Sequence, residues 1–196
     1  MTERRKKEIC AVAAKLFSQK GFENISTRDI SKAVGLSDAG IYYYFKTKEN
    51  LLFQILYDIL NPGLELVREI DRSNQSFEEK LTSFMKFYTR YYSPEIEKLK
   101  LLVEEPKKVK NTHRRKINKI EREYLDILVR ILDGLKREGK MTDMDSTVCA
   151  FAFFAMVHWV YRWYNPKGTI SPEDLSEIFN RIINYGIRPQ CQCGSR

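Results

Sequence analysis

The chain has 196 residues, of which 43% are hydrophobic and 31% are charged. This balance excludes a disordered chain, and the length allows one or two small domains with a real core. The net charge of +8 favours a polyanionic partner, although many soluble proteins carry such a charge.

Two segments bear on where the protein resides. Residues 3–8 are highly charged and no apolar stretch follows them, so the sequence predicts no signal peptide. The most apolar run, residues 148–164, is short for a membrane span and is interrupted by His158 and Arg162. We therefore expect a cytoplasmic protein that does not bind a membrane.

The four cysteines fit a reducing compartment. Cys10 and Cys149 stand singly inside apolar helical patterns, where a cysteine acts as a small buried hydrophobe. Cys191 and Cys193 lie in a polar stretch, residues 189–196, with no Cys or His nearby to complete a metal site. We expect a flexible tail there and no bound metal.

The N-terminal patterns predict a helix-turn-helix. Apolar residues recur at helical spacing over about residues 3–20, and Gly21 ends that helix. Ser26 and Asp29 have the spacing of a capping box that opens a second short helix, and Gly35 makes the turn after it. Such a pair of short helices can brace and fill the major groove of DNA.

The third helix begins at Ser37 or Asp38, and Ile41 and Phe45 face inward from it. Its outer edge is polar and carries Ser37, Asp38, Gly40, Tyr43 and Tyr44. Glycine lets the backbone approach DNA closely, and tyrosine hydroxyls can donate to phosphates. Thr27, Arg28 and Lys48 start the flanking helices, where free backbone N–H groups attract phosphate.

Six further helices are expected, and no strand pattern is found. Thr47 caps the fourth, which Pro62 and Gly63 should kink or break. The others are expected over 76–93, 94–105, a long stretch ending before Gly139, about 143–164, and from Ser171 to Gly186 or Pro189. The sequence thus predicts an all-α chain of nine helices.

Residues 26–52, together with Ala14-Lys15-Leu16-Phe17 and Gly21-Phe22, resemble the signature of the TetR family of bacterial one-component regulators. The resemblance implies a dimer with a variable C-terminal ligand domain. It implies that phosphates are held by Thr27, Arg28, Tyr42, Tyr44 and Lys48, and that Ser37, Asp38, Gly40 and Tyr43 lie nearest the base edges. Asp38 departs from this pattern, since an acidic residue repels phosphate; it can accept from a cytosine amino group or simply cap the helix.

The expected helix over about 143–164 is apolar nearly all round and must be covered on several sides. By the residues alone it is a core helix. The TetR resemblance implies that one face lines a ligand cavity and another packs with the ninth helix in a dimer interface. Its large aromatics suit either role: Phe151, Phe154, Trp159 and Trp163. His158 and Arg162 share a face and can orient a ligand or bond a buried carbonyl or carboxylate.

Residues 158–175 also resemble the C-terminal domain of TetR-family regulators of fatty-acid and steroid breakdown, which sense acyl-CoA thioesters. An acyl chain would then lie in a cavity formed by Phe84, Met85, Tyr88, Leu102 and Tyr124. The basic segment, residues 107–119, holds seven Lys or Arg and no acidic residue. It can meet CoA phosphates, form a solvated helix start, or add nonspecific DNA contacts, and the sequence leaves these three open.

We therefore expect residues 1–46 to bind a palindromic double-stranded operator, and residues 47–188 to bind a small hydrophobic effector and form a homodimer through the last two helices. The leading hypothesis is a repressor released by a fatty acyl-CoA. A multidrug-responsive repressor of an efflux gene is one alternative, and a helical ligand-binding protein or enzyme that does not bind DNA is another. No catalytic constellation or nucleotide-binding glycine loop is found, so we expect neither an enzyme nor a cofactor.

Overall fold

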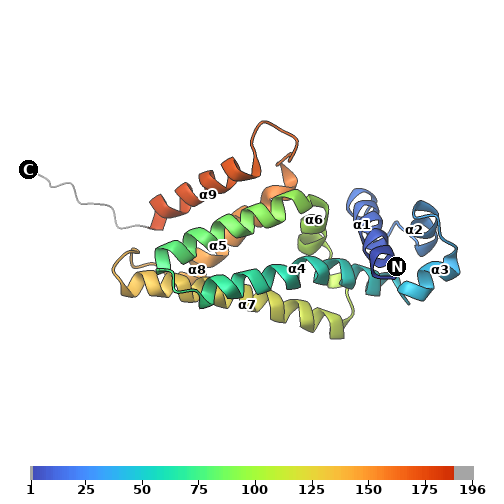
Figure 1. Ribbon diagram of the computed structural model, residues 1–196, viewed down its shortest axis with the longest axis horizontal. Helices are drawn as coiled ribbons and strands as arrows, with labels where there is room; N and C mark the ends of the chain where they lie inside the picture. Colours follow the sequence, from blue (N-terminus) through green and yellow to red (C-terminus); the bar gives the residue numbers. More distant parts are fainter. Residues whose placement is uncertain (1, 188–196) are drawn as a thin grey trace, which may run out of the picture. The chain divides into compact units, whose positions relative to one another are not determined.

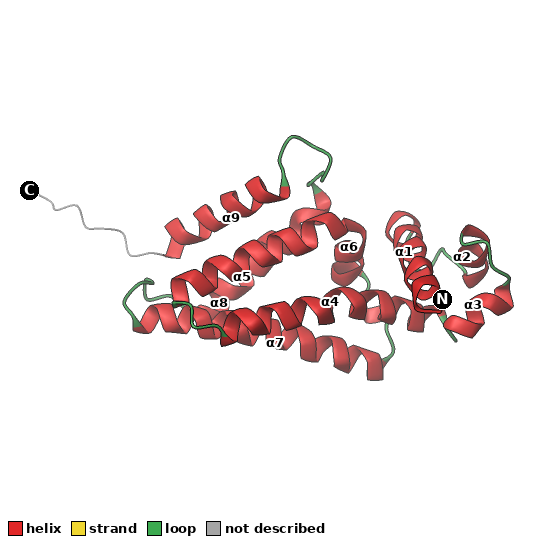
Figure 2. Cartoon of the chain, in the orientation of Figure 1, coloured by secondary structure: helices red, strands yellow, loops and turns green. Residues whose placement is uncertain are grey.

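The computed structural model describes residues 2–187, which form nine α-helices and three short 3₁₀ helices without a strand (Figures 1 and 2). The predicted all-α fold with nine helices is confirmed for this part of the chain. In chain order the elements are α1 (Thr2–Lys20), α2 (Thr27–Ala33), α3 (Asp38–Tyr44), α4 (Lys48–Arg72), α5 (Phe77–Tyr92), η1 (Ser93–Glu95), α6 (Ile96–Glu104), η2 (Pro106–Lys108), α7 (Asn111–Arg137), α8 (Ser146–His158), η3 (Trp159–Arg162) and α9 (Pro172–Ile187).

The described residues divide into two compact units. The first unit holds residues up to Gly63 together with Glu95–Glu121, and the second holds Leu64–Pro94 together with the described residues from Arg122 onward. Within the first unit, α1 packs on α2 and α6, and α2 packs on α3. Within the second, α5 packs on α9. The predicted functional boundary after residue 46 stays a prediction, because these units reflect packing alone.

Local signals place the N-terminal helices. The Ser26 hydroxyl accepts from the Asp29 amide at 3.2 Å, and the Asp29 carboxylate accepts from the Ser26 amide at 2.9 Å, so the capping box is confirmed. Gly21 and Gly35 adopt φ of 84° and 65°, which a residue with a Cβ rarely reaches. Both chain reversals therefore depend on glycine.

Two helix boundaries differ from expectation. Pro62 lies inside α4, which continues to Arg72 instead of breaking. Proline removes one helical hydrogen bond, but buried apolar residues on both sides, such as Leu60 and Leu64, hold the helix together. The apolar helix α8 is shorter than expected: Asp145 caps its start, and it ends at His158, where a 3₁₀ turn tightens the chain.

The cysteines and the apolar helices bear on the predictions about compartment and membrane. Cys10 is buried in α1, and burial raises the pKa of its thiol to about 12, so it behaves as an inert small side chain. Cys191 and Cys193 lie outside the described residues. Between residues 2 and 187, none of the helices has the length and apolar character that a membrane crossing requires.

Candidate nucleic-acid interface and ligand pocket

Helix α3 presents its polar edge to solvent while Ile41 anchors it in the core of the first unit. Ser37 caps the helix, and its hydroxyl accepts from the Gly40 amide at 3.1 Å. Tyr42 and Tyr43 are 52% and 77% exposed, although large aromatic side chains are usually buried. An exposed aromatic pair on a short capped helix is a surface available to a partner.

The predicted contact residues of α2 and α3 converge. The hydroxyl oxygens of Thr27 and Tyr42 lie 3.3 Å apart, so the start of α2 and the middle of α3 share one polar edge. The rings of Tyr43 and Tyr44 meet edge to face with centroids 5.1 Å apart. Arg28 is exposed at the first turn of α2. Polar side chains beside a helix N-terminus suit phosphate oxygens.

The carboxylate of Asp38 does not cap α3, which corrects the expectation from sequence. Ser37 is the cap, and Asp38 Oδ1 accepts from the Ser31 hydroxyl of α2 at 2.5 Å. The Arg28 Nε lies 4.0 Å from the other carboxylate oxygen. Asp38 thus links the two helices of the helix-turn-helix, and its negative charge is partly offset by Arg28. A contact between Asp38 and a cytosine amino group stays a prediction.

Lys48 is held at the first turn of α4 by the loop after α1. Its ammonium donates to the Phe22 carbonyl at 2.8 Å and stands 4.3 Å from the centroid of the Phe22 ring. An ammonium has three donors, so this anchoring leaves N–H groups for a phosphate. The predicted role of Lys48 in DNA binding therefore remains chemically available.

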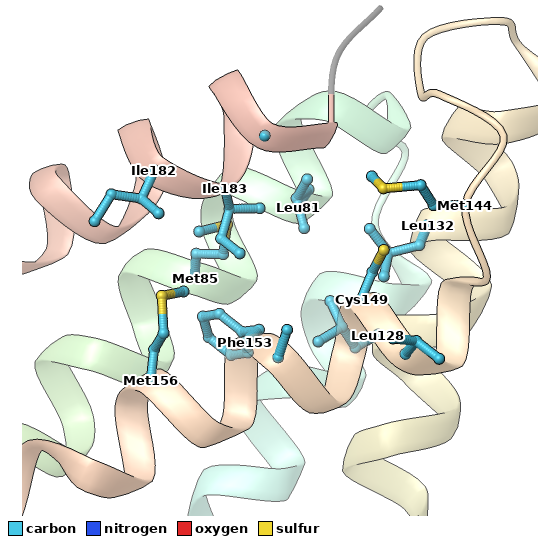
Figure 3. Close-up of a pocket in the computed structure, with 13 residues that line it drawn as sticks. Leu81, Met85, Leu128, Leu132, Met144, Cys149, Phe153, Met156, Ile182 and Ile183 are labelled. Atoms are coloured by element: carbon cyan, nitrogen blue, oxygen red, sulfur yellow. The ribbon is translucent and has the colours of Figure 1, made fainter.

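An apolar pocket of about 380 Å³ lies in the second unit among α5, α7, α8 and α9 (Figure 3). Among the residues that the structure describes, no charged side chain lines it, so it suits a hydrophobic group. Its lining residues are Leu81, Met85, Leu128, Leu132, Met144, Val148, Cys149, Ala152, Phe153, Met156, Ile182, Ile183 and Gly186. Burial raises the pKa of the Cys149 thiol, so this side chain is a neutral lining group.

Two family models match the chain. Residues 9–55, which run from α1 into α4, match "Bacterial regulatory proteins, tetR family". Residues 74–187, more than half of the chain, match "Tetracyclin repressor-like, C-terminal domain". The chain belongs to the TetR family of transcriptional regulators. It is a DNA-binding repressor of that family and not an enzyme.

Other DNA-binding and regulatory proteins match along nearly the whole chain. The HTH-type transcriptional repressor KstR2 of Mycolicibacterium smegmatis is 28% identical, over 93% of this chain and 90% of its own. A TetR/AcrR-family regulator from Thermobifida fusca YX-ER1 is 31% identical with a TM-score of 0.73, covering 95% of this chain and 100% of that one. AibR, in a crystal structure with isovaleryl coenzyme A and operator DNA, is 25% identical with a TM-score of 0.81, covering 91% and 97%.

In this TetR-family chain, most of the predicted ligand residues lie on the inward faces of α5, α7 and α8. One of them, Met85, also lines the pocket. The remaining inward-facing residues form an aromatic cluster beside the pocket, in which Phe84 and Phe154 pack with Tyr88. The members of this cluster are Phe84, Tyr88, Tyr124, Phe154 and His158. The cavity predicted for an acyl chain therefore overlaps the observed pocket at Met85 and otherwise corresponds mainly to the aromatic cluster.

Two hydrogen bonds involve the polar atoms of the aromatic cluster. The Tyr88 hydroxyl lies 2.7 Å from Nε2 of His158, whose pKa burial lowers to about 4, so the ring is neutral at pH 7. Tyr124 accepts a hydrogen bond from the Tyr92 hydroxyl at 3.2 Å, and burial raises the pKa of both phenols. The polar atoms of these side chains are thus neutral.

The other predicted ligand residues lie elsewhere. Phe151 and Trp159 are 58% and 54% exposed, and the Arg162 guanidinium stacks over the Trp159 ring at 4.8 Å on the surface. Leu102 is buried in α6 and belongs to the first unit. The structure therefore brings together the residues of α5, α7 and α8 that point inward, and leaves Phe151, Trp159 and Arg162 at the surface.

Sequence reasoning missed most of the pocket lining. Leu81, Leu128 and Ile182 lie in apolar stripes of α5, α7 and α9, a pattern that also describes ordinary core residues, and Cys149 was expected to be a small buried hydrophobe. A stripe of leucine or isoleucine looks the same in sequence whether it meets another side chain or an empty volume.

Proposed function

We propose that this chain represses transcription from a palindromic operator and is released by a fatty acyl-CoA. The apolar pocket carries this proposal: a volume of about 380 Å³ with no charged lining among the described residues can take an aliphatic chain. The likeness to AibR, whose structure contains isovaleryl coenzyme A, supports a thioester of that class. As a DNA-binding protein of bacterial type, it would act in the cytoplasm.

The proposed partner for dimerisation is a second copy of the chain, joined through α8 and α9. These helices expose large apolar side chains that a solvated monomer would rarely show, among them Val148, Phe151, Ile178, Ile182 and Tyr185. Covering them with the same surface of another protomer would bury them around a two-fold axis. A two-fold dimer then presents two α3 helices to two half-sites, which fits a palindrome.

The proposed mechanism is a shift between two states. Two recognition helices must sit about 34–36 Å apart to enter successive major grooves. A ligand that binds more tightly to a state with a different spacing releases the DNA. The boundary between the compact units falls in α4 directly after Pro62 and Gly63. The proline lacks one helical hydrogen bond, which supports this position as the hinge.

A drug-responsive repressor is the second candidate. The pocket lining, which carries no charge among the described residues, favours a neutral apolar compound as much as an acyl chain. The two candidates differ at the polar end of the ligand, because only CoA brings phosphates that need cationic partners. Binding of acyl-CoA, free fatty acid and CoA, each measured alone, separates them.

Calorimetry on a pocket-filling variant tests the assignment of the pocket. Replacing Cys149 with phenylalanine adds a ring to the lining and should weaken acyl-CoA binding by about 10-fold or more. Lys86→Phe on α5 is the control, since Lys86 is exposed, does not line the pocket and lies outside α8 and α9. Equal affinities of Cys149→Phe and wild type would place the ligand elsewhere.

A further inference from the structure

The basic segment, residues 107–119, belongs to the same compact unit as the helix-turn-helix. It comprises most of η2 and the first turns of α7. Val109 and Ile117 are buried and fix the segment in this unit. The ring of His113 stacks on Phe53 of α4, with centroids 4.0 Å apart and planes 10° apart. The segment is therefore packed against the helix that begins with Lys48.

One acidic side chain connects the segment to the predicted phosphate contacts. Glu23, in the loop after α1, pairs with Lys108. The hydrogen bond and charge of Lys108 lower the pKa of Glu23, and the charge of Lys48 lowers it further. Lys48 itself donates to the neighbouring Phe22 carbonyl. Lys108 and Lys48 therefore both lie against the loop that holds Phe22 and Glu23, so a cation of the basic segment and a predicted phosphate contact share one loop.

The remaining cations of the segment are open to solvent. Six of its side chains are exposed: Lys107, Lys108, Lys110, Arg115, Lys116 and Lys119. Within residues 2–187, Lys108 is the member of this set with a carboxylate within 4.0 Å. Arg115 and Lys119 are four residues apart and share a face of α7, on the side away from Ile117. Exposed cations of one sign form a surface for a polyanion.

We propose that the basic segment is an accessory DNA surface, which contacts backbone phosphates beside the site read by α3. DNA is favoured over CoA because the segment shares its compact unit and Glu23 with the helix-turn-helix, whereas the pocket residues all belong to the second unit. The contacts are to phosphates, so they add affinity without sequence preference. Glu23 limits this affinity, because its carboxylate holds Lys108 and repels phosphate. The inference rests on the DNA binding of the proposed function.

The test is the salt dependence of DNA binding by the variant Lys110→Gln/Arg115→Gln/Lys116→Gln. Glutamine keeps helix propensity and removes charge at three exposed sites. Its control is Lys86→Gln/Arg122→Gln/Lys167→Gln, which removes three exposed cations of the second unit. Both variants lower the net charge by the same amount, so their long-range electrostatic attraction to DNA is equal. Circular dichroism melting checks that both variants fold.

Fluorescence anisotropy on operator and on unrelated duplex DNA gives the slope of log affinity against log salt. Each lost phosphate contact reduces the magnitude of this slope by about 0.9. The slope of the basic-segment variant should therefore be smaller in magnitude than that of wild type by about 2 to 3 per protomer on both duplexes. The control should match wild type. Glu23→Gln should bind both duplexes more tightly, by about 2- to 10-fold.

Equal slopes for the two triple variants would overturn the proposal and leave the segment as a solvated helix start. An unchanged slope combined with weaker acyl-CoA binding would assign the cations to CoA phosphates instead. Failure of wild type to prefer its operator over unrelated DNA would contradict the proposed function alone. The slope on unrelated duplex still decides the role of the basic segment in that case.

Discussion

Replacing His158 with glutamine should remove a pH dependence of stability that the wild-type protein shows. The imidazole of His158 is held next to the Tyr88 hydroxyl at 2.7 Å, and burial lowers its pKa from 6.5 to about 4. As the pH falls below 6.5, His158 becomes protonated in the unfolded chain but stays neutral in the folded chain. The stability contributed by neutral His158 is therefore complete above pH 6.5 and is lost progressively down to about pH 4.

The size of the effect follows from the pKa of His158 in the folded and unfolded chains. Each tenfold difference in proton affinity between the two states corresponds to about 1.4 kcal/mol, so the full loss of stability is about 3 kcal/mol, and about 2 kcal/mol of it has occurred by pH 5. Urea unfolding at pH 7.5 and pH 5.0, at one protein concentration, measures this loss. Wild type should lose about 2 kcal/mol more than His158→Gln between the two pH values.

Tyr88→Phe is the matched control, because it removes the hydrogen-bond partner and keeps the titrating ring. It should retain the pH dependence of wild type. If His158→Gln and wild type lost the same stability between pH 7.5 and 5.0, the ring would not be desolvated in the folded protein, and the aromatic cluster would not exclude water from it.

Three further predictions address the dimer, the DNA surface and the second unit. Phe151→Glu places a charge on an exposed apolar side chain of α8 and should convert the proposed dimer into monomers in analytical ultracentrifugation, while a dimer of unchanged affinity would move the interface elsewhere. Lys48→Ala should weaken binding to all duplexes alike by about 10-fold, whereas Ser37→Ala should change the preferred sequence in a binding selection. Gly134→Ala should lower the free energy of unfolding by about 1–3 kcal/mol in urea titrations, because a Cβ there would lie 2.4 Å from the Phe77 ring, and an unchanged value would contradict that packing.

Features set by residues close in sequence were predicted well. The capping box at Ser26 depends on a carboxylate three residues away, and it is present in the structure. Gly35 and Gly139 take positive φ at the turns where glycine was expected to end or join helices. In these cases the deciding contacts lie within one turn of the chain, so the sequence alone contains the information.

Features that depend on a partner far along the chain were not predictable in this way. Asp38 is engaged by Ser31 of another helix, which a capping pattern does not reveal. The pocket requires α5, α7, α8 and α9 to leave space between apolar stripes, and a stripe does not state how closely its neighbour packs. The course of α4 through Pro62 likewise depends on the tertiary burial of its flanking turns.

Fluorescence anisotropy with DNA from the region upstream of the gene tests the central claim most directly. The protein is bound to this duplex and titrated separately with long-chain acyl-CoA, free fatty acid and CoA. The proposed function predicts release by acyl-CoA and none by free fatty acid or CoA at the same concentration. Tight binding that none of the three ligands changes would contradict the acyl-CoA effector, and the search would turn to neutral drug-like compounds.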